Sequence, residues 1–425
     1  MGELVRTKDI RRMPGVEPLF MIEKWMVQRR MARLGSPPVA MLVGNAGAIY
    51  TPKERPVGTV IIRDLPTLLR FVLEPELHFG DAYSEGKIEV EGDLSEVLQA
   101  AFRCMAGTAT GGLIGTARSR LLRRPRANSL VGSRRNIHAH YDIGNDFYRL
   151  WLDDRMQYTC AYFPSPAATL EEAQIAKMDH VCRKLMLRPG ETVVEAGSGW
   201  GTLALHMAKH YGVTVRAYNI SREQVKSARE RAKAEGIAGR VEYIEDDYRN
   251  MRGTFDAFVS VGMLEHVGVR HYRELGGVIE RSLKENGRGL IHTIGRNTSE
   301  LMNPWIERRI FPGAYPPTLR EMMEIFEPSG FSILDVENLR LHYARTLQHW
   351  LERFERAEEQ VRSMFDERFV RVWRLYLAGS IAAFAAGDLQ LFQVVFAHPK
   401  KNDLPWTRAH VYGERTPGGG AHGDL

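Results

Sequence analysis

Three closely spaced glycines follow an apolar segment near the middle of the chain. Residues 193–203 read VVEAGSGWGTL, so Glu195 is followed by Gly197, Gly199 and Gly201. Glycine adopts positive φ readily and lets a ligand approach the backbone without a Cβ clash. The start of a helix behind the turn would add free N–H groups. This pattern is typical of a turn that holds an adenosyl cofactor.

The spacing of these glycines disfavours two common nucleotide sites. A dinucleotide fold uses G-x-G-x-x-G with an acidic residue about 20 positions later. Here the pattern is E-x-G-x-G-x-G, and the next predicted strand, residues 213–218, is followed by Asn219. No G-K-[ST] follows either, which disfavours a phosphate-binding loop. The turn resembles the first motif of class I methyltransferases, which bind S-adenosylmethionine. A similar turn in another α/β domain remains the alternative, because short glycine motifs are weak signals.

Composition indicates a globular protein of ordinary type. The chain has 425 residues, long enough for two domains, with 44% hydrophobic and 26% charged residues. Its three cysteines, Cys104, Cys160 and Cys182, form no CxxC pair, which favours a reducing cytoplasm. The start of the chain has no apolar signal-peptide core, and the longest apolar run, residues 377–386, is too short to span a membrane. We therefore expect no transmembrane segment.

Hydrophobic periodicity divides the chain into four parts. We expect a small α+β domain over residues 1–105, a basic linker over 106–135, an α/β catalytic domain over 136–412 and a disordered tail over 413–425. In the first domain we expect helices at 19–34, 65–73 and 94–104, and strands at 39–43, 59–63 and 87–91. In the catalytic domain we expect strands at 192–195, 214–218, 241–245, 257–261, 289–293 and 389–397, with a long helical stretch from 346 to about 385. Strands alternating with helices predict a Rossmann-like parallel sheet covered on both faces.

The predicted linker is rich in arginine. It contains no acidic residue between positions 118 and 135, although the whole chain has a net charge of only +6. The basic residues of this segment are Arg118, Arg120, Arg123, Arg124, Arg126, Arg134 and Arg135. Such a segment can bind anionic lipid headgroups, at about 1 kcal/mol per basic residue. A solvated linker accounts for the composition equally well.

Six further segments carry a family resemblance. They read HYDIGNDF at 140–147, LWLD at 150–153, QYTCAYF at 157–163, VGMLEHVG at 261–268, HTIG at 292–295 and QLFQVVF at 390–396. Together they resemble the cyclopropane-fatty-acyl-phospholipid synthases and their mycolic acid cyclopropane synthase relatives. The resemblance covers residues 136–397 closely and the N-terminal part more loosely. It implies transfer of a methylene group from S-adenosylmethionine to a cis double bond of a phospholipid acyl chain, through a carbocation.

The resemblance also implies that a bound bicarbonate ion removes the last proton. Its cage would comprise the backbone amides of Cys160 and Ile294, the carboxyl group of Glu265, the ring of His292 and the hydroxyl of Tyr343. Taken singly, each residue has a structural interpretation: an exposed carboxylate, a core histidine, a core tyrosine ring and a small buried thiol. Their joint presence in the expected segments favours the cage.

The same resemblance assigns the cofactor contacts. Tyr158 and Thr159 would close over the methionine end, and Gly197, Gly199 and Gly201 would lie under the cofactor. The ribose would contact Asn219, Ile220 and Gln224, and the adenine would contact Asp247 and Tyr248. We expect Glu195 to order the glycine turn rather than contact the cofactor.

Three positions depart from the family pattern. Thr159 and Ser198 stand where serine and cysteine are usual, and Ser380 replaces a cysteine that is common near the C-terminus. A mechanism that needs a thiol nucleophile at that last position is therefore doubtful here. His206 and His210 have a spacing that can bind zinc, but no glutamate follows His206, so we expect no metal site.

Other functions remain possible at this stage. A related lipid C-methyltransferase could leave a methyl or methylene branch instead of a ring. A lipid-binding protein could keep the fold without activity, but the complete cage disfavours it. An RNA methyltransferase would fit the basic linker, but no RNA-binding module is evident, so we expect no nucleic acid partner. The resemblance implies a homodimer that acts at the cytoplasmic surface of the inner membrane, and the N-terminal domain would help to lift an acyl chain from the bilayer.

Overall fold

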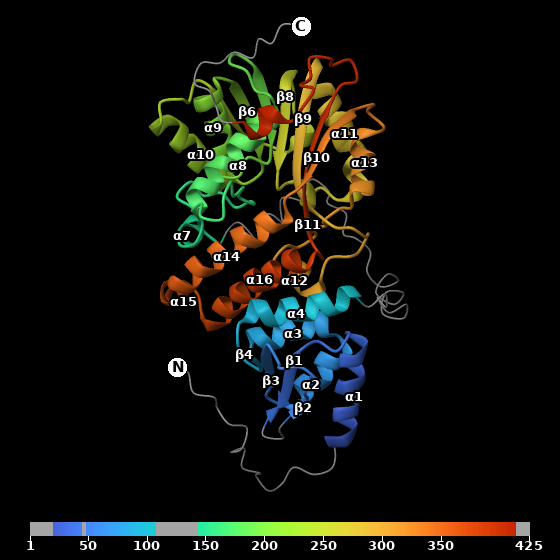
Figure 1. The fold of residues 1–425 in the computed structure, drawn as a ribbon. Coiled ribbons are helices and arrows are strands. Elements are labelled where there is room, and N and C mark those ends of the chain that lie inside the picture. Colours follow the sequence, from blue (N-terminus) through green and yellow to red (C-terminus); the bar gives the residue numbers. More distant parts are fainter. Residues whose placement is uncertain (1–19, 45–47, 108–142, 414–425) are drawn as a thin grey trace.

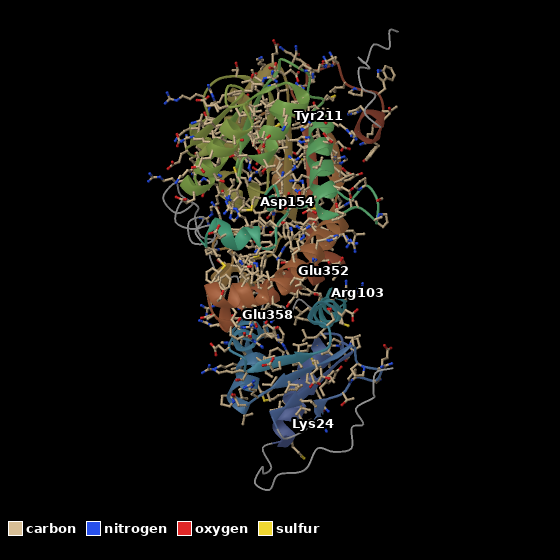
Figure 2. The ribbon with its side chains drawn as sticks, turned by 90° about the vertical axis from the view of Figure 1, so that its left-hand side faces the viewer. Lys24, Arg103, Asp154, Tyr211, Glu352 and Glu358 are labelled. Carbon is tan, nitrogen blue, oxygen red and sulfur yellow. The ribbon has the colours of Figure 1, made fainter. Side chains whose placement is uncertain are left out.

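The computed structural model describes residues 20–44, 48–107 and 143–413 of the chain. Two sheets lie at opposite ends of an elongated molecule, with a layer of helices between them (Figure 1). Three parts of the chain lie outside the described residues: the arginine-rich part of the predicted linker, residues 45–47, and the predicted tail from residue 414. Figure 2 shows the same order from the side, with Lys24 on helix α1 of the smaller domain, Glu358 in the middle layer and Tyr211 in the larger domain.

The larger sheet has seven strands in the order β10-β11-β9-β8-β5-β6-β7. Its strands are β5 (Thr192–Ala196), β6 (Thr214–Asn219), β7 (Val241–Glu245), β8 (Phe255–Val261), β9 (Leu283–Gly295), β10 (Ser332–Asn338) and β11 (Gln390–Ala397). All six predicted strands of this domain are confirmed, and five of them differ little in length. The exception is β9, which was predicted over residues 289–293 but has 13 residues. The sheet is mixed rather than parallel, because β11 runs antiparallel to both β9 and β10. The expectation of a purely parallel sheet was wrong at this edge, where the unpredicted β10 lies.

Alternating side chains of the strands form two separate cores. Val193 and Val259 pack with helices α8 and α9 on one face, whereas Val194 and Phe258 pack with α11 and α13 on the other. Successive side chains of a strand point to opposite faces of the sheet, and both faces are buried here. The buried strands of this sheet therefore contain runs of apolar and β-branched residues. The helices and turns of this domain are α7 (Asn145–Arg149), α8 (Leu170–Lys184), α9 (Thr202–Tyr211), α10 (Arg222–Ala234), η2 (Tyr248–Asn250), η3 (Leu264–His266), η4 (Val269–His271), α11 (Tyr272–Ser282), α12 (Pro304–Arg309), α13 (Leu319–Phe326) and α17 (Ala409–Tyr412).

The smaller domain is built on a four-stranded sheet of order β2-β1-β3-β4. Its elements are α1 (Phe20–Arg33), β1 (Val39–Val43), β2 (Ala48–Tyr50), β3 (Gly58–Ile62), α2 (Leu65–Leu73), α3 (Pro75–Ser84), β4 (Ile88–Glu91) and α4 (Leu94–Gly107). The α+β prediction is confirmed, and Asp93 caps α4 by accepting from the Glu96 amide at 2.9 Å. Helix α3 and strand β2 were not predicted.

The helical layer between the two sheets consists of α14 (Arg340–Arg356), α15 (Glu358–Met364) and α16 (Glu367–Ala386). The helical stretch expected from residue 346 to about 385 is confirmed, and it consists of three helices separated after Arg356 and before Asp366. The Asp366 side chain caps α16 by accepting from the Phe369 amide. Helix α16 is long and apolar enough to cross a membrane, contrary to our expectation from the apolar run. It packs against α14 on one side and against α3 and α4 on the other, which is the setting of a core helix.

Polar contacts join the smaller domain to this helical layer. Arg371 of α16 donates to the carbonyls of Tyr83 and Ile88, binds Glu89 at 3.0 Å, and lies 4.3 Å from the centre of the Tyr83 ring. Arg309 of α12 forms a two-pronged ion pair with Asp81 of α3. These contacts fix the smaller domain against the catalytic domain.

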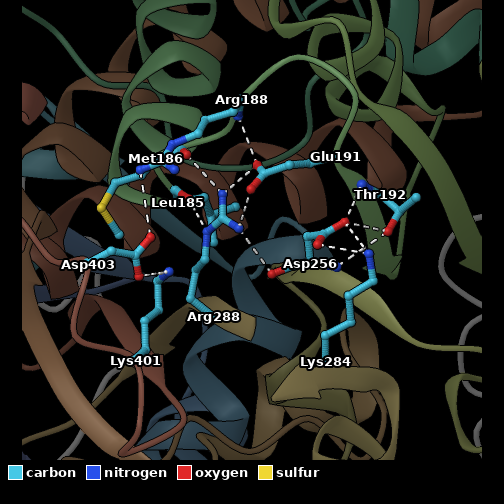
Figure 3. Close-up of polar contacts among 10 residues, drawn as sticks. All are labelled: Leu185, Met186, Arg188, Glu191, Thr192, Asp256, Lys284, Arg288, Lys401 and Asp403. Carbon is cyan, nitrogen blue, oxygen red and sulfur yellow. Dashed lines mark hydrogen bonds and ion pairs between the residues drawn. The ribbon is translucent and has the colours of Figure 1, made fainter. Parts of the chain in front are cut away.

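A buried arginine closes the end of the large sheet at which β5 begins (Figure 3). Arg288 of β9 donates to the carbonyls of Leu185 and Met186 and forms a two-pronged ion pair with Glu191. Beside it, Asp256 accepts from Thr192 and from Lys284. In α/β sheets, ligands bind at the carboxyl ends of the strands. This cluster lies at the opposite end and is therefore structural.

Candidate active site

The glycine turn is shaped by close backbone packing. Gly197 and Gly201 have φ of +83° and +80°. A Cβ on Gly197 would lie 2.9 Å from Met263 Cβ, and one on Gly201 would lie 2.6 Å from the Tyr243 ring. Asn219, at the end of β6, donates to the carbonyl of Gly199 at 3.0 Å. Only glycine fits at positions 197 and 201, because any other residue would clash with its neighbours.

A pocket lies over this turn at the carboxyl ends of the strands. Six of the ten predicted cofactor residues line this pocket. Lys177 and Glu195, which were not predicted to contact the cofactor, line it as well. The lining residues are Met156, Gln157, Tyr158, Thr159, Lys177, Glu195, Gly197, Ser198, Gly199, Trp200, Thr202, Leu203, Asn219, Gln224, Val261, Gly262, Met263 and His266. Gly201, Ile220, Asp247 and Tyr248 are not among them, so their cofactor contacts stay predictions.

Lys177 and Glu195 are buried titratable residues that line this pocket. Lys177 Nζ donates to Gln157 Oε1 at 2.7 Å and to Thr159 Oγ1 at 2.8 Å. Burial lowers the pKa of Lys177 to about 8 and raises the pKa of Glu195 to about 8, and the attraction between the two charges opposes both shifts. Glu195 Oε2 has no partner among the described residues. Glu195 lines the pocket, and the expectation that it orders the glycine turn rather than contacts the cofactor stays a prediction.

Asp247 has a strong local partner. Its carboxylate accepts from Arg249 Nε and Nη2 at 2.8 and 2.9 Å, and it also caps η2 by accepting from the Arg249 amide. Tyr248 is buried beside it, with the Arg249 guanidinium 5.3 Å from the ring centre. Arg249 therefore holds the carboxylate that the resemblance assigns to the adenine amino group.

Glu265 lies in η3, one residue from His266 of the pocket wall. Its Oε1 accepts from the Ile294 amide at 2.7 Å, while Oε2 is buried without a partner in the described part of the chain. Burial raises the pKa of Glu265 to about 7, although the Ile294 amide favours the ionised form. The Ile294 amide thus binds Glu265 in this structure. The predicted contacts of both residues with a bicarbonate ion stay predictions.

His292 is a buried, neutral histidine near the end of β9. Burial, together with the nearby Lys177 and Lys184, lowers its pKa to about 3. Its Nδ1 lies 3.0 Å from Gln393 Nε2, and its Nε2 has no partner among the residues that the structure describes. The His292 carbonyl accepts from the Gly262 amide at 2.9 Å, which joins β9 to the loop that carries Glu265.

Cys160 and Tyr343 approach the end of β9 from other segments. The Ala161 amide donates to Thr346 Oγ1 of α14 at 3.0 Å, one turn beyond Tyr343. The start of α14 is in turn bound to Leu391, which pairs with Ile294 across β11 and β9. Burial raises the pKa of the Cys160 thiol far above its usual range, so this thiol stays protonated. These contacts link the segments of Cys160 and Tyr343 to β11 and β9, and the assembly of all five residues into one cage stays a prediction.

An aromatic wall closes the pocket toward the helical layer. Tyr158 Oη lies 2.9 Å from Tyr376 Oη of α16, and its ring packs against Trp151 and Trp350 at 5.3 and 5.4 Å. Trp151 and Trp350 are fully buried. This wall excludes water from the side of the pocket where Tyr158 lies.

His206 and His210 of α9 lie close to each other, and His206 contacts a neighbouring helix. His206 Nε2 lies 2.9 Å from Asp179 Oδ1, and the His206 and His210 rings are 4.6 Å apart. Among the described residues, no group of three or more potential metal ligands occurs.

The strand order, the glycine turn and the pocket above it define a class I methyltransferase fold. Residues 129–394, more than half of the chain, match the family model described as mycolic acid cyclopropane synthetase. The chain therefore belongs to this family of S-adenosylmethionine-dependent enzymes.

Individual relatives agree with this assignment. A "Probable fatty acid methyltransferase" of Pseudomonas putida is 37% identical over 84% of this chain and 92% of its own length. The cyclopropane-fatty-acyl-phospholipid synthase of Escherichia coli is 39% identical over 79% of this chain and 86% of its own. The solved mycolic acid cyclopropane synthase CmaA1, complexed with SAH and CTAB, has a TM-score of 0.59 and 29% identity, over 62% of this chain and 98% of its own.

Proposed function

We propose that this protein transfers a methylene group from S-adenosylmethionine to the cis double bond of unsaturated phospholipid acyl chains and closes a cyclopropane ring. The observation that carries the proposal is a pair of buried atoms, Glu265 Oε2 and His292 Nε2, that have no partner among the described residues. Glu265 directly precedes His266, which lines the cofactor pocket. Buried polar atoms without partners cost free energy unless a ligand satisfies them. A site for a small polar ion explains both atoms.

The residues present suit bicarbonate in particular. His292 is neutral and can donate one hydrogen bond, whereas a carboxylate at Glu265 can only accept. An ion with both acceptor oxygens and one O–H group satisfies the two together. When bound, S-adenosylmethionine would supply an electrophilic methyl group and bicarbonate would supply the base that removes the last proton.

The remaining residues would orient and shield the reaction. Lys177 fixes Gln157 and Thr159 in the pocket wall, and Tyr158 is held by its hydroxyl contact with Tyr376. The buried rings of the aromatic wall keep water away from a carbocation, which water would quench. Cys160 would act through its backbone amide and Tyr343 through its hydroxyl.

Product analysis tests the proposal. The full chain is incubated with vesicles of cis-monounsaturated phospholipid and S-adenosylmethionine with a deuterated methyl group. We expect label in the lipid and upfield cyclopropyl signals in the proton spectrum. No incorporated label would contradict the proposal.

A second product class is compatible with the same cofactor pocket. The Pseudomonas relative is named for fatty acid methylation, so a methyl or methylene branch is the alternative product. Deuterium label in the lipid without cyclopropyl signals in the same experiment would favour the branch.

We also propose that the enzyme works as a homodimer bound peripherally to the cytoplasmic face of the membrane, where its lipid substrate lies. The chain has a net charge of +6, which suits an anionic surface. Co-sedimentation with anionic vesicles, lost at high salt, would support this contact, and equal binding to neutral vesicles would contradict its electrostatic basis.

A further inference from the structure

The motif QLFQVVF contains a buried glutamine that the proposed reaction does not yet use. Gln393 is fully buried in β11, directly opposite His292 of β9 in the antiparallel pairing. Paired residues of neighbouring strands place their side chains on the same face of a sheet. The row continues to Glu337 of β10, which also pairs with Gln393.

The contact between these side chains has a defined direction. Gln393 Nε2 lies 3.0 Å from His292 Nδ1, and an amide nitrogen can only donate. His292 Nδ1 is therefore the acceptor, and in a neutral ring the hydrogen must sit on Nε2. His292 Nε2 is the atom that is buried without a partner among the described residues.

We propose that Gln393 is a positioning residue that fixes His292 in the tautomer with hydrogen on Nε2, so that the ring presents a donor to the bound anion. This inference rests on the proposed function for the identity of the anion. The other tautomer would turn a lone pair toward the anion and lose the hydrogen bond. A neutral amide suits this task because a carboxylate at position 393 would instead accept a hydrogen from Nδ1.

The surroundings of His292 favour the neutral ring that this device requires. The charged and titratable groups on the neighbouring elements are Lys177, His180 and Lys184 of α8 and Glu337 of β10. Lys184 and His180 both bind Glu337, at 2.6 Å each, so the nearest carboxylate is already engaged. No carboxylate in this group is left to draw a hydrogen to His292 Nδ1.

The test observes the ring nitrogens directly. The full chain is labelled with ¹⁵N-histidine, and the His292 signals are assigned by their loss in His292→Asn. We expect the wild type to show a protonated Nε2 and an unprotonated Nδ1. In Gln393→Glu the pattern should reverse, and in Gln393→Leu, which keeps the fold without a polar partner, it should become a mixture of both tautomers.

Turnover and cofactor affinity complete the design. We expect turnover on vesicles to fall at least tenfold in Gln393→Glu and less in Gln393→Leu, with the dissociation constant for S-adenosylmethionine changed by less than about threefold. A wild-type spectrum with Nδ1 protonated, or an unaltered tautomer in both variants, would overturn the inference whatever the activity. A reversed tautomer with full turnover would support the control of the tautomer by Gln393 but contradict the anion contact of the proposed function.

Discussion

Replacing Glu265 by glutamine should stabilise the protein at alkaline pH while abolishing turnover. Burial raises the pKa of Glu265 from its ordinary 4.5 to about 7, so the folded state binds this proton more tightly than the unfolded state does. Glu265 therefore leaves the free energy of unfolding of the wild type unchanged below pH 4.5. Its ionisation lowers that free energy as the pH rises from 4.5 to about 7, and the loss persists above pH 7. A difference of about 2.5 pKa units corresponds to about 3 kcal/mol at pH 8. Glutamine keeps the acceptor for the Ile294 amide but carries no charge.

The assay compares thermal unfolding of both proteins without cofactor across this pH range. We expect Glu265→Gln to melt above the wild type at pH 8 and to converge with it near pH 4.5. The matched control is Glu352→Gln on the exposed side of α14, which should follow the wild type at every pH (Figure 2). Turnover of Glu265→Gln should be lost with cofactor affinity retained. If Glu265→Gln melts below the wild type at pH 8, the ionised Glu265 carboxylate does not destabilise the folded state, and the reasoning is refuted.

Three further predictions concern other parts of the molecule. Lys177→Met removes the ammonium that holds Gln157 and Thr159, and it should weaken cofactor binding about ten- to hundredfold, as measured by calorimetry. The control, Lys209→Met, removes an exposed ion pair and should leave the affinity unchanged. Equal cofactor affinities of the two variants would contradict the role of the buried amine. Arg371→Met removes contacts between α16 and the smaller domain and should speed the proteolytic release of that domain. The control is Arg368→Met, because Arg368 is exposed. Identical digestion of the two variants would argue against this interface. Iodoacetamide at pH 8 should leave Cys160 unmodified in the native protein, because burial raises the pKa of its thiol; rapid alkylation without unfolding would show that the thiol is accessible.

The sequence predicts the core of the catalytic sheet well, because its strands are β-branched runs buried on both faces. It does not predict β10, an edge strand that reads SILDVEN and is only partly buried. Polar and charged residues on such an edge weaken the strand signal. The break between α14 and α16 was also missed, since apolar periodicity continues through the interruption. The start of α16 is marked by Asp366, whose side chain caps that helix.

For the site, the sequence identifies residues more readily than their partners. Lys177 reads as one of several charged residues on a helix, and only the packing of α8 against the pocket shows that it is buried. The donation from the Ile294 amide to Glu265 joins residues 29 positions apart and depends on the register of β9. Gln393 lies 101 positions from its partner His292, and its role became visible only when β11 was placed beside β9.

The requirement for bicarbonate tests the proposed ion site most directly. Turnover on phospholipid vesicles is measured in buffer freed of carbon dioxide, and bicarbonate is then added back. We expect low turnover of the wild type, restored in a saturable manner, and no response in His292→Leu, which lacks the proposed donor. Equal turnover with and without bicarbonate in the wild type would contradict the assignment of Glu265 and His292 as the holders of the base.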